Sequence, residues 1–147
     1  NNISLVTEIA NRFGSQCIVG SIEAKRQPDG SWQSYIDNGR EPTGLDVLEW
    51  VQKLETAGIG ELLLTSVDQD GTRRGFDIDL FEAVSAATSR PIILSGGYGK
   101  PGHLTSLAAT GQLPSAIAIA SSFHYEQISP TELIQSTGNL GSTGLAA

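Results

Sequence analysis

The sequence has little cysteine, no methionine and few basic residues. Its one cysteine, Cys17, cannot form an internal disulfide, which excludes a disulfide-rich scaffold and favours a reducing compartment; we therefore expect a cytoplasmic protein. Nine basic residues stand against sixteen acidic ones, and this formal net charge of −7 argues against a nucleic-acid-binding or membrane-binding surface. No apolar run approaches the roughly 20 residues that span a bilayer, and we recognise no signal peptide.

Glycine is abundant: 17 of the 147 residues, against the ~7% that is usual. Charged residues make up only 17%, below the ~25% of typical domains. This composition favours an apolar, turn-rich, enzyme-like fold, and the length is sufficient for a core. Because the first residue is Asn1 and not methionine, we expect the chain to be a piece of a longer protein.

The order of apolar segments predicts one helix followed by four strand–helix units. In the first helix, apolar residues recur at helical spacing from Leu5 to Phe13, and Gly14 is placed to end it. The predicted strands cover residues 17–22, 61–68, 91–95 and 116–120. The helices that follow them are expected to begin near Thr43 and Asp46 (a capping pair), at Asp77, after the glycine cluster 96–102, and at Ser129-Pro130.

Two segments fall outside this repeat. The polar stretch 25–42 contains the turn signal Pro28-Asp29-Gly30 followed by alternating apolar and polar residues, which predicts a small hairpin braced by Trp32 and Tyr35. The tail from about residue 138 is small and polar, and we expect it to be disordered.

The predicted strands are continuous apolar runs, which is typical of parallel strands buried on both faces. Two architectures fit four such units: an open doubly wound sheet, or half of an eight-stranded barrel. Both place ligands at the carboxyl ends of the strands.

Acidic residues follow the first two strands, and small residues follow the last two. Carboxylates can transfer protons to a bound substrate, whereas glycine and serine let backbone N–H groups approach a phosphate. The acidic ends contain Glu23, Asp68 and Asp70. The small-residue ends contain Ser95, Gly96, Gly97, Ala120 and Ser121.

Each of these features has a structural alternative. The Asp-Gln-Asp-Gly sequence and the glycine pair can be simple turns, and Glu23 can pair with Lys25 or Arg26. His124 is expected to cap or pack a helix, and Cys17 to be a buried apolar side chain. The chain has no Walker motif, no zinc-spaced Cys/His set and no nucleophile elbow, so we predict no metal site and no cofactor.

Five sequence strings are distinctive: IEAKR (22–26), REPTGLDVLEW (40–50), GELLLTSVDQDGTRRGFD (60–77), SGGYGK (95–100) and ASSFHY (120–125). On these strings, which occur in the same order, the chain resembles the cyclase subunit of imidazole glycerol phosphate synthase over roughly residues 2–136. The sister isomerase of histidine biosynthesis shares the barrel and a similar Asp-Gly-Thr turn, but it does not usually have the Ala-Lys-Arg, Pro-Thr-Gly and Phe-His-Tyr strings.

The resemblance implies a TIM-barrel fold of eight strand–helix units, of which residues 1–147 would be the carboxyl-terminal half: a four-stranded half barrel preceded by one helix. With a glutaminase subunit, the family converts ammonia and a phosphoribulosyl aminoimidazole nucleotide to imidazole glycerol phosphate and aminoimidazole carboxamide ribotide. The missing half would hold the strand-one aspartate, one phosphate cradle and most of the ammonia gate. A half barrel leaves an apolar face uncovered, so we also expect copies of the chain to associate.

Roles for single residues follow from the same resemblance. Asp70 matches a catalytic aspartate that acts as general acid and base, Asp68 matches a supporting acid, and Glu61 matches one member of the ammonia gate. The positions that match residues binding the phosphate or the glycerol phosphate are Thr65, Gly71, Ser95, Gly97, Ala120 and Ser121.

Glu23 departs from the family, which usually has aspartate at this position. One added methylene moves the carboxylate by about 1 Å, a displacement that can cost ~10²-fold in rate. The departure can equally mark a divergent branch, a cyclase-like subunit that amidinates a surface-polysaccharide sugar. A second alternative follows from the missing strand-one aspartate: a phosphate-binding half barrel with no turnover by itself.

Overall fold

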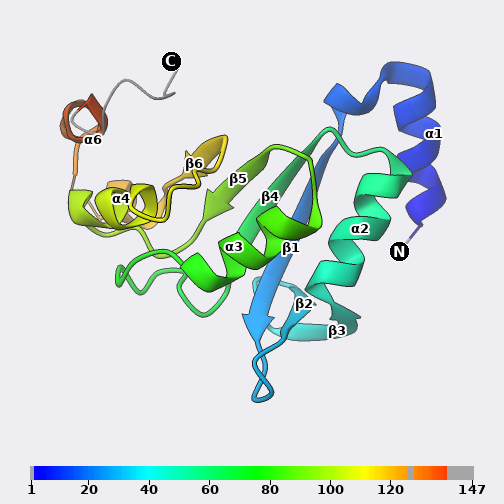
Figure 1. The fold of residues 1–147 in the computed structure, drawn as a ribbon, viewed down its shortest axis with the longest axis horizontal. Helices are drawn as coiled ribbons and strands as arrows, with labels where there is room; N and C mark the ends of the chain where they lie inside the picture. Colours follow the sequence, from blue (N-terminus) through cyan, green and yellow to red (C-terminus); the bar gives the residue numbers. More distant parts are fainter. Residues whose placement is uncertain (1, 126–127, 139–147) are drawn as a thin grey trace.

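The computed structural model describes residues 2–125 and 128–138, which form one open mixed sheet with helices (Figure 1). The sheet has six strands in the order β3-β2-β1-β4-β5-β6. In chain order the elements are α1 (Ile3–Phe13), the 3-10 helix η1 (Ser15–Cys17), β1 (Val19–Arg26), β2 (Trp32–Ile36), β3 (Glu41–Asp46), α2 (Val47–Ala57), β4 (Glu61–Ser66), α3 (Ile78–Ala87), β5 (Ile92–Ser95), α4 (Pro101–Ala108), β6 (Ala116–Ala118), α5 (Ser121–His124) and α6 (Pro130–Gly138).

Four of the strands confirm the predicted parallel half barrel. β1, β4, β5 and β6 are parallel neighbours in chain order, and the sheet is not closed. A helix follows β4, β5 and β6 directly, and α2 follows β1 after β2 and β3. The predicted hairpin adds two strands to these four. The hairpin expected within 25–42 adds β2 and β3 as antiparallel strands beyond β1, and β1 therefore extends to Arg26 instead of ending at Ile22.

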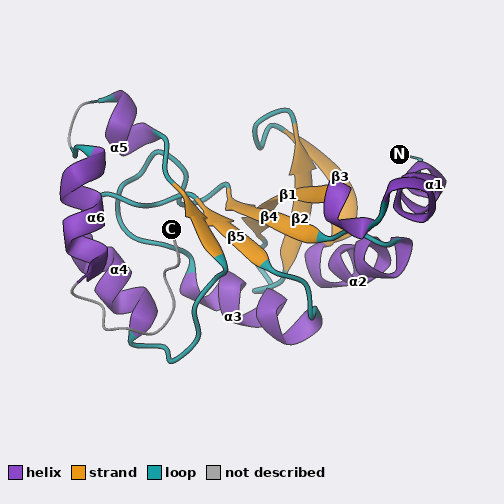
Figure 2. Cartoon of the chain, turned by 90° about the horizontal axis from the view of Figure 1, so that it is seen from above, coloured by secondary structure: helices purple, strands orange, loops and turns teal. Residues whose placement is uncertain are grey.

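Only one face of the sheet is buried, which corrects the expectation of burial on both faces. Along β4, Leu62 and Leu64 are fully buried while Leu63 between them is half-buried. Figure 2 shows α2 and α3 together on one side of the sheet. Among the described residues no layer covers the other side, so apolar side chains there keep partial exposure. The core on the covered side includes Ile22, Ala24, Val47, Val51, Leu80, Phe81, Val84, Ile92, Leu94, Leu104 and Leu107.

The start of α2 is fixed by Asp46 alone. Its carboxylate accepts hydrogen bonds from the backbone N–H groups of Leu48 (2.9 Å) and Glu49 (3.0 Å), as an N-cap does. Thr43, predicted to share the cap, lies in β3, and its hydroxyl donates to the carbonyl of Ser34 instead. The hairpin places Thr43 in a strand, which removes it from the helix start.

The first helix forms as predicted but lies outside the core. α1 ends at Gly14 and packs beside α2 (Figure 2), and none of its residues is buried. Leu5 is 50% exposed and Phe13 56%. Cys17 follows α1 in η1 and is exposed, so its prediction as a buried side chain was wrong. Both results have one cause: α1 and η1 are peripheral to the sheet.

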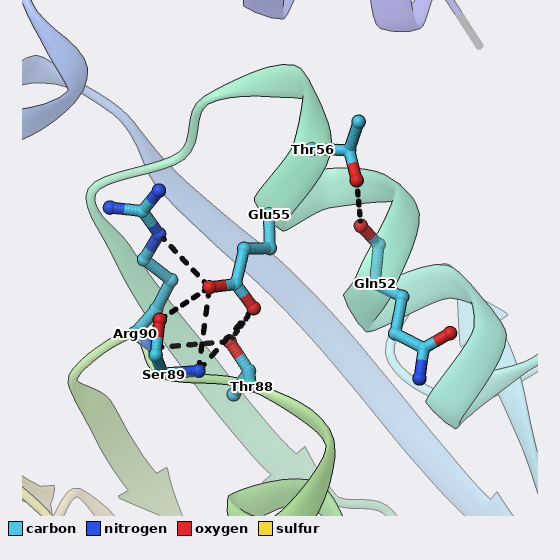
Figure 3. Close-up of polar contacts among 6 residues, drawn as sticks. All are labelled: Gln52, Glu55, Thr56, Thr88, Ser89 and Arg90. Carbon is cyan, nitrogen blue, oxygen red and sulfur yellow. Dashed lines mark hydrogen bonds and ion pairs between the residues drawn. The ribbon is translucent and has the colours of Figure 1, made fainter.

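A polar cluster ties the end of α2 to the segment that enters β5 (Figure 3). The Glu55 carboxylate accepts hydrogen bonds from the hydroxyls of Thr88 (2.6 Å) and Ser89 (2.5 Å), and the Arg90 guanidinium lies 3.6 Å away at ion-pair distance. These hydroxyls, that of Ser89 first, hold the pKa of Glu55 below its usual value. The cluster lies at the amino-terminal end of the strands, opposite the predicted site.

The last described helix, α6, begins as predicted. Ser129 and Glu132 form a capping box in which each side chain binds the other residue's backbone N–H. The tail predicted to be disordered, from about residue 138, lies almost wholly outside the described residues. Within the described part, no helix is both long enough and apolar enough to cross a membrane.

Candidate site at the strand ends

The open face of the sheet presents a row of polar side chains near the carboxyl ends of the strands. Glu23 is the register partner of Thr65, and Thr65 is the partner of Ser95. Residues paired in this way lie on one face, about 4.8 Å apart along the sheet. The structure therefore brings a carboxylate and two hydroxyls, all half-buried, into one line, which we call the strand-end row.

The side chains beneath the strand-end row are mostly apolar, and an acid lies at the far end. The next row on the same face contains Ser21, Leu63, Ile93 and Ala116. Glu61 begins β4 on this face, four residues before Thr65, which corresponds to about 13 Å along the strand. One face thus has hydroxyls and a carboxylate at one end, apolar side chains in the middle and Glu61 at the other end.

The two aspartates after β4 differ in their surroundings. Asp68 accepts a hydrogen bond of 2.7 Å from the backbone N–H of Arg26, so its carboxylate joins the end of β1 to this loop. Asp70 is exposed, and its side chain makes no hydrogen bond or ion pair with the described part of the chain. Of the two, Asp70 is the carboxylate available to a bound molecule.

The glycine cluster after β5 packs directly against the loop of Asp70. A Cβ at Gly96 would lie 3.4 Å from the Asp70 nitrogen and 2.9 Å from the Ser66 carbonyl oxygen, and the φ of Gly96 is +94°. Gly97, with φ +95°, lies so close to Gly75 that a Cβ would collide with its carbonyl oxygen. The close approach requires glycine, which supports the tight-turn interpretation and places this turn beside Asp70.

The end of β6 adjoins the same cluster. Ala120 precedes α5, and its carbonyl accepts hydrogen bonds from the backbone N–H groups of Phe123 and His124. The buried Ser122 hydroxyl donates to the Tyr98 carbonyl at 3.0 Å, which holds Ala120 and Ser121 near the glycine cluster. His124 is exposed, and its ring lies edge-on to that of Tyr125, so it is not a buried packing residue.

Tyr98 anchors the cluster from inside the core, a role that the sequence reasoning missed. It is 3% exposed and packs against Phe76 and His103. Burial raises the pKa of the Tyr98 hydroxyl and, together with the charge of Lys100, lowers that of His103. The detectable signal was a large aromatic residue within a run of glycines.

The expected alternative for Glu23, a pair with Lys25 or Arg26, was wrong. The Lys25 ammonium lies 5.3 Å from the centre of the Tyr35 ring, whereas Arg26 binds Asp79 at 2.6 Å and stacks on Trp32. The two ring contacts, Lys25 with Tyr35 and Arg26 with Trp32, join β1 to β2 and brace the hairpin, as predicted. Glu23 instead accepts a hydrogen bond of 2.7 Å from the backbone N–H of Gly39.

The strand-end row lies on the side of the sheet that no described layer covers, and its three side chains are half-buried. A groove of about 490 Å³ lies between α1 and α2, where Ile3, Glu49 and Lys53 are among its lining residues, well away from the row. The described residues include no group of three histidine, cysteine or acidic side chains that could hold a metal ion.

Comparison with known proteins gives one consistent family. The family described as "Histidine biosynthesis protein" matches residues 1–129. The imidazole glycerol phosphate synthase subunit HisF of Streptococcus sanguinis (strain SK36) is 47% identical over 135 residues, which cover 89% of this chain and 52% of that protein. The subunit of the same name from Streptococcus gordonii (strain Challis) is 46% identical over 135 residues, which again cover 89% of this chain and 52% of the relative. That of Legionella pneumophila is 57% identical over 99 residues, which cover 67% of this chain and 47% of the relative. The chain spans about half the length of the curated relatives it matches.

Proposed function

Because the chain belongs to the histidine biosynthesis protein family, we propose that it supplies the carboxyl-terminal half of an imidazole glycerol phosphate synthase cyclase. The whole enzyme, a lyase, would use ammonia to convert a phosphoribulosyl aminoimidazole nucleotide to imidazole glycerol phosphate and aminoimidazole carboxamide ribotide. As a step of amino-acid biosynthesis on small phosphorylated metabolites, the reaction is proposed to take place in the cytoplasm.

The observation that carries this proposal is the strand-end row beside the Asp70 loop. Asp70 is exposed next to the glycine turn at Gly96, where it could give a proton to a substrate lying on the row and take one from it. Asp68 would act in support by holding this loop to β1, and the half-buried Glu23 would be the second carboxylate facing the substrate.

Substrate phosphate is proposed to bind at the small-residue ends of β5 and β6. Backbone N–H groups can surround a phosphate closely where no side chain intervenes. The hydroxyls of Thr65 and Ser95 would bind the adjoining glycerol part. The proposed phosphate-binding backbone comprises Gly71, Gly96, Gly97, Ala120 and Ser121.

Ammonia is proposed to arrive from the opposite end of the sheet. Glu61 begins β4 at that end, and the apolar residues Leu63 and Ile93 separate it from the strand-end row. An apolar passage suits a neutral molecule better than an ion, because an ion loses hydration there. A glutaminase subunit docked at the Glu61 end would release ammonia into this passage.

The first test is Asp70→Asn in the intact cyclase. The change removes the proton-transferring group but keeps its size, so we expect turnover to fall by at least ~10²-fold, the contribution typical of general acid–base catalysis. Because Asp70 is exposed, stability should change by less than about 0.5 kcal/mol. Turnover is measured with the nucleotide and ammonium salts, and stability by urea unfolding.

Two results would contradict the proposal. A large loss of stability in Asp70→Asn would make Asp70 structural, and unchanged turnover would remove its acid–base role. The same assay on the present chain alone tests the alternative of a phosphate-binding half barrel: turnover near that of the intact enzyme excludes it.

A further inference from the structure

The turn between β2 and β3 has an unusual backbone and a specific anchor. Asp37, Asn38 and Gly39 have φ values of 54°, 56° and 76°, so three consecutive residues are left-handed. This conformation is unfavourable for residues other than glycine, although aspartate and asparagine tolerate it best. The anchor is the Gly39 N–H, which donates to the Glu23 carboxylate at 2.7 Å.

Gly39 also brings the turn into contact with the loop after β4, which contains Asp68 and Asp70. A Cβ at Gly39 would collide with the side chain of Val67, so the turn and Val67 are in direct contact. The Val67 nitrogen is fixed to the Ala24 carbonyl at 2.9 Å, and Asp68 follows it in the chain. Gly39 is therefore the point where the hairpin, β1 and the loop after β4 meet.

Glu23 is suited to this contact by its length and by the positions of its neighbours. Lys25 and Arg26 are directed to Tyr35 and Asp79, so the backbone N–H of Gly39 is the hydrogen-bond donor to Glu23 among the described residues. A bond from an N–H to a charged carboxylate is stronger than one between neutral groups. An aspartate at this position would be about 1 Å short of the Gly39 nitrogen and beyond hydrogen-bond range.

We propose that Glu23 is a positioning residue, which fixes the β2–β3 turn beside the strand-end row. One carboxylate oxygen holds the turn, and the turn then forms a fixed wall of the surface on which the substrate lies. That a substrate lies on this surface rests on the proposed function, but the hydrogen bond between Glu23 and Gly39 does not. The glutamate that departs from the family's usual aspartate thus has a task that its extra methylene makes possible.

The test is amide hydrogen exchange at Gly39, measured by NMR on the chain without ligand. Glu23→Asp and Glu23→Ala remove the anchor and should speed exchange at Gly39 about tenfold or more, the range expected for a bond to a charged group. Glu23→Gln keeps an acceptor oxygen at full length and should restore most of the protection. Glu41→Asp is the matched control, because Glu41 is exposed in the same hairpin and loses the same methylene.

Exchange at Leu62 and Leu64 in the core of β4 reports whether each variant is folded. Unchanged exchange at Gly39 in both Glu23→Asp and Glu23→Ala would overturn the proposal, as would an equal increase in Glu41→Asp. Glu23→Ser, which is also too short to reach Gly39, replaces Glu23→Asp or Glu23→Ala if either fails to fold.

A kinetic comparison in the intact cyclase separates positioning from proton transfer. If Glu23 acts through the turn, kcat/KM is higher for Glu23→Gln than for Glu23→Asp. The reverse order would overturn the positioning role. An intact enzyme without turnover would contradict the proposed function. It would not contradict the hydrogen bond between Glu23 and Gly39, because the exchange measurement tests that bond without substrate.

Discussion

At the scale of single residues, Gly97 marks the tightest backbone approach near the proposed site. Its carbonyl accepts a hydrogen bond of 2.9 Å from the Gly75 nitrogen, and a Cβ on Gly97 would collide with the Gly75 carbonyl oxygen. Gly97 is buried and its φ is +95°, so both space and backbone conformation exclude a side chain. The loops after β4 and β5 are held together at this point.

Gly97→Ala is therefore expected to destabilise the chain by about 2–4 kcal/mol, because the neighbouring backbone has to move. Gly102→Ala is the matched control. Gly102 lies in α4 with open space around it, so alanine should stabilise that helix by about 0.5–1 kcal/mol. Urea unfolding measures both changes, and equal stabilities of Gly97→Ala and the parent chain would contradict the close approach.

Glu55 gives a prediction about pH. Hydrogen bonds from Ser89 and Thr88 lower its pKa in the folded state below the usual 4.5, so the charged form stabilises the fold. This contribution is complete above pH 4.5 and is lost as the pH falls through the lower, folded-state pKa. Glu55→Ala should cost about 1–2 kcal/mol at pH 7 and less in acid. Urea unfolding between pH 3 and 7 measures the difference, and a cost independent of pH would contradict the role of the charge.

Single residues also differ in how far sequence could predict them. Glu23, Thr65 and Ser95 were predictable as strand-end residues, because they close apolar runs whose parallel pairing fixes their face. The contact of Glu23 with Gly39 was not, because it depends on how a turn 16 residues away folds back. The exposure of Cys17 was also missed, since an apolar run does not reveal which elements will cover it.

At the scale of elements, α2 is defined at both ends by single residues. Asp46 caps its start, and Gly58 ends it with a left-handed φ of 101°. Gly58 and Asp46 were predictable as the ends of this helix, whereas Thr43, predicted to share the cap, lies in β3. The polar sequence before a helix does not show whether it is loop or edge strand.

Asp46→Ala should lower stability by about 1 kcal/mol, because two N–H groups of the first turn lose their acceptor. Asp46→Asn keeps a side-chain oxygen and should retain most of the stability. Urea midpoints of the two variants measure the difference. If both variants lose the same amount, the charge of Asp46 and not its hydrogen bonds stabilises the helix.

At the scale of the whole molecule, the sheet has one covered and one open side. The open side includes Val19, 51% exposed, and the half-buried Leu63 and Ile93. Apolar surface of this kind is removed from water when another layer covers it. A protein that spans half the length of its relatives would have this layer supplied by the other half or by a second copy.

We accordingly expect the isolated chain to self-associate at micromolar concentration, with light scattering giving a mass above that of one chain. Leu63→Lys should shift the mass towards the monomer, since it places a charge on the open face. Leu113→Lys is the control, because Leu113 is 47% exposed but lies in the loop between α4 and β6 and not on the sheet. A monomer at all concentrations would contradict the expectation.

The hairpin also limits how the sheet can grow. The edge strand on the hairpin side is β3, which contains Pro42 and so lacks one N–H for pairing. Behind it, β2 pairs with Glu23 to Arg26 of β1, which leaves the outer backbone of β1 open to a further strand only over Val19–Ile22. At the other edge, β6 is three residues long. An incoming strand would find about 13 Å of template on β1 and less on β6. Short templates of this kind disfavour open-ended strand addition, so the chain should form small closed assemblies and not fibrils.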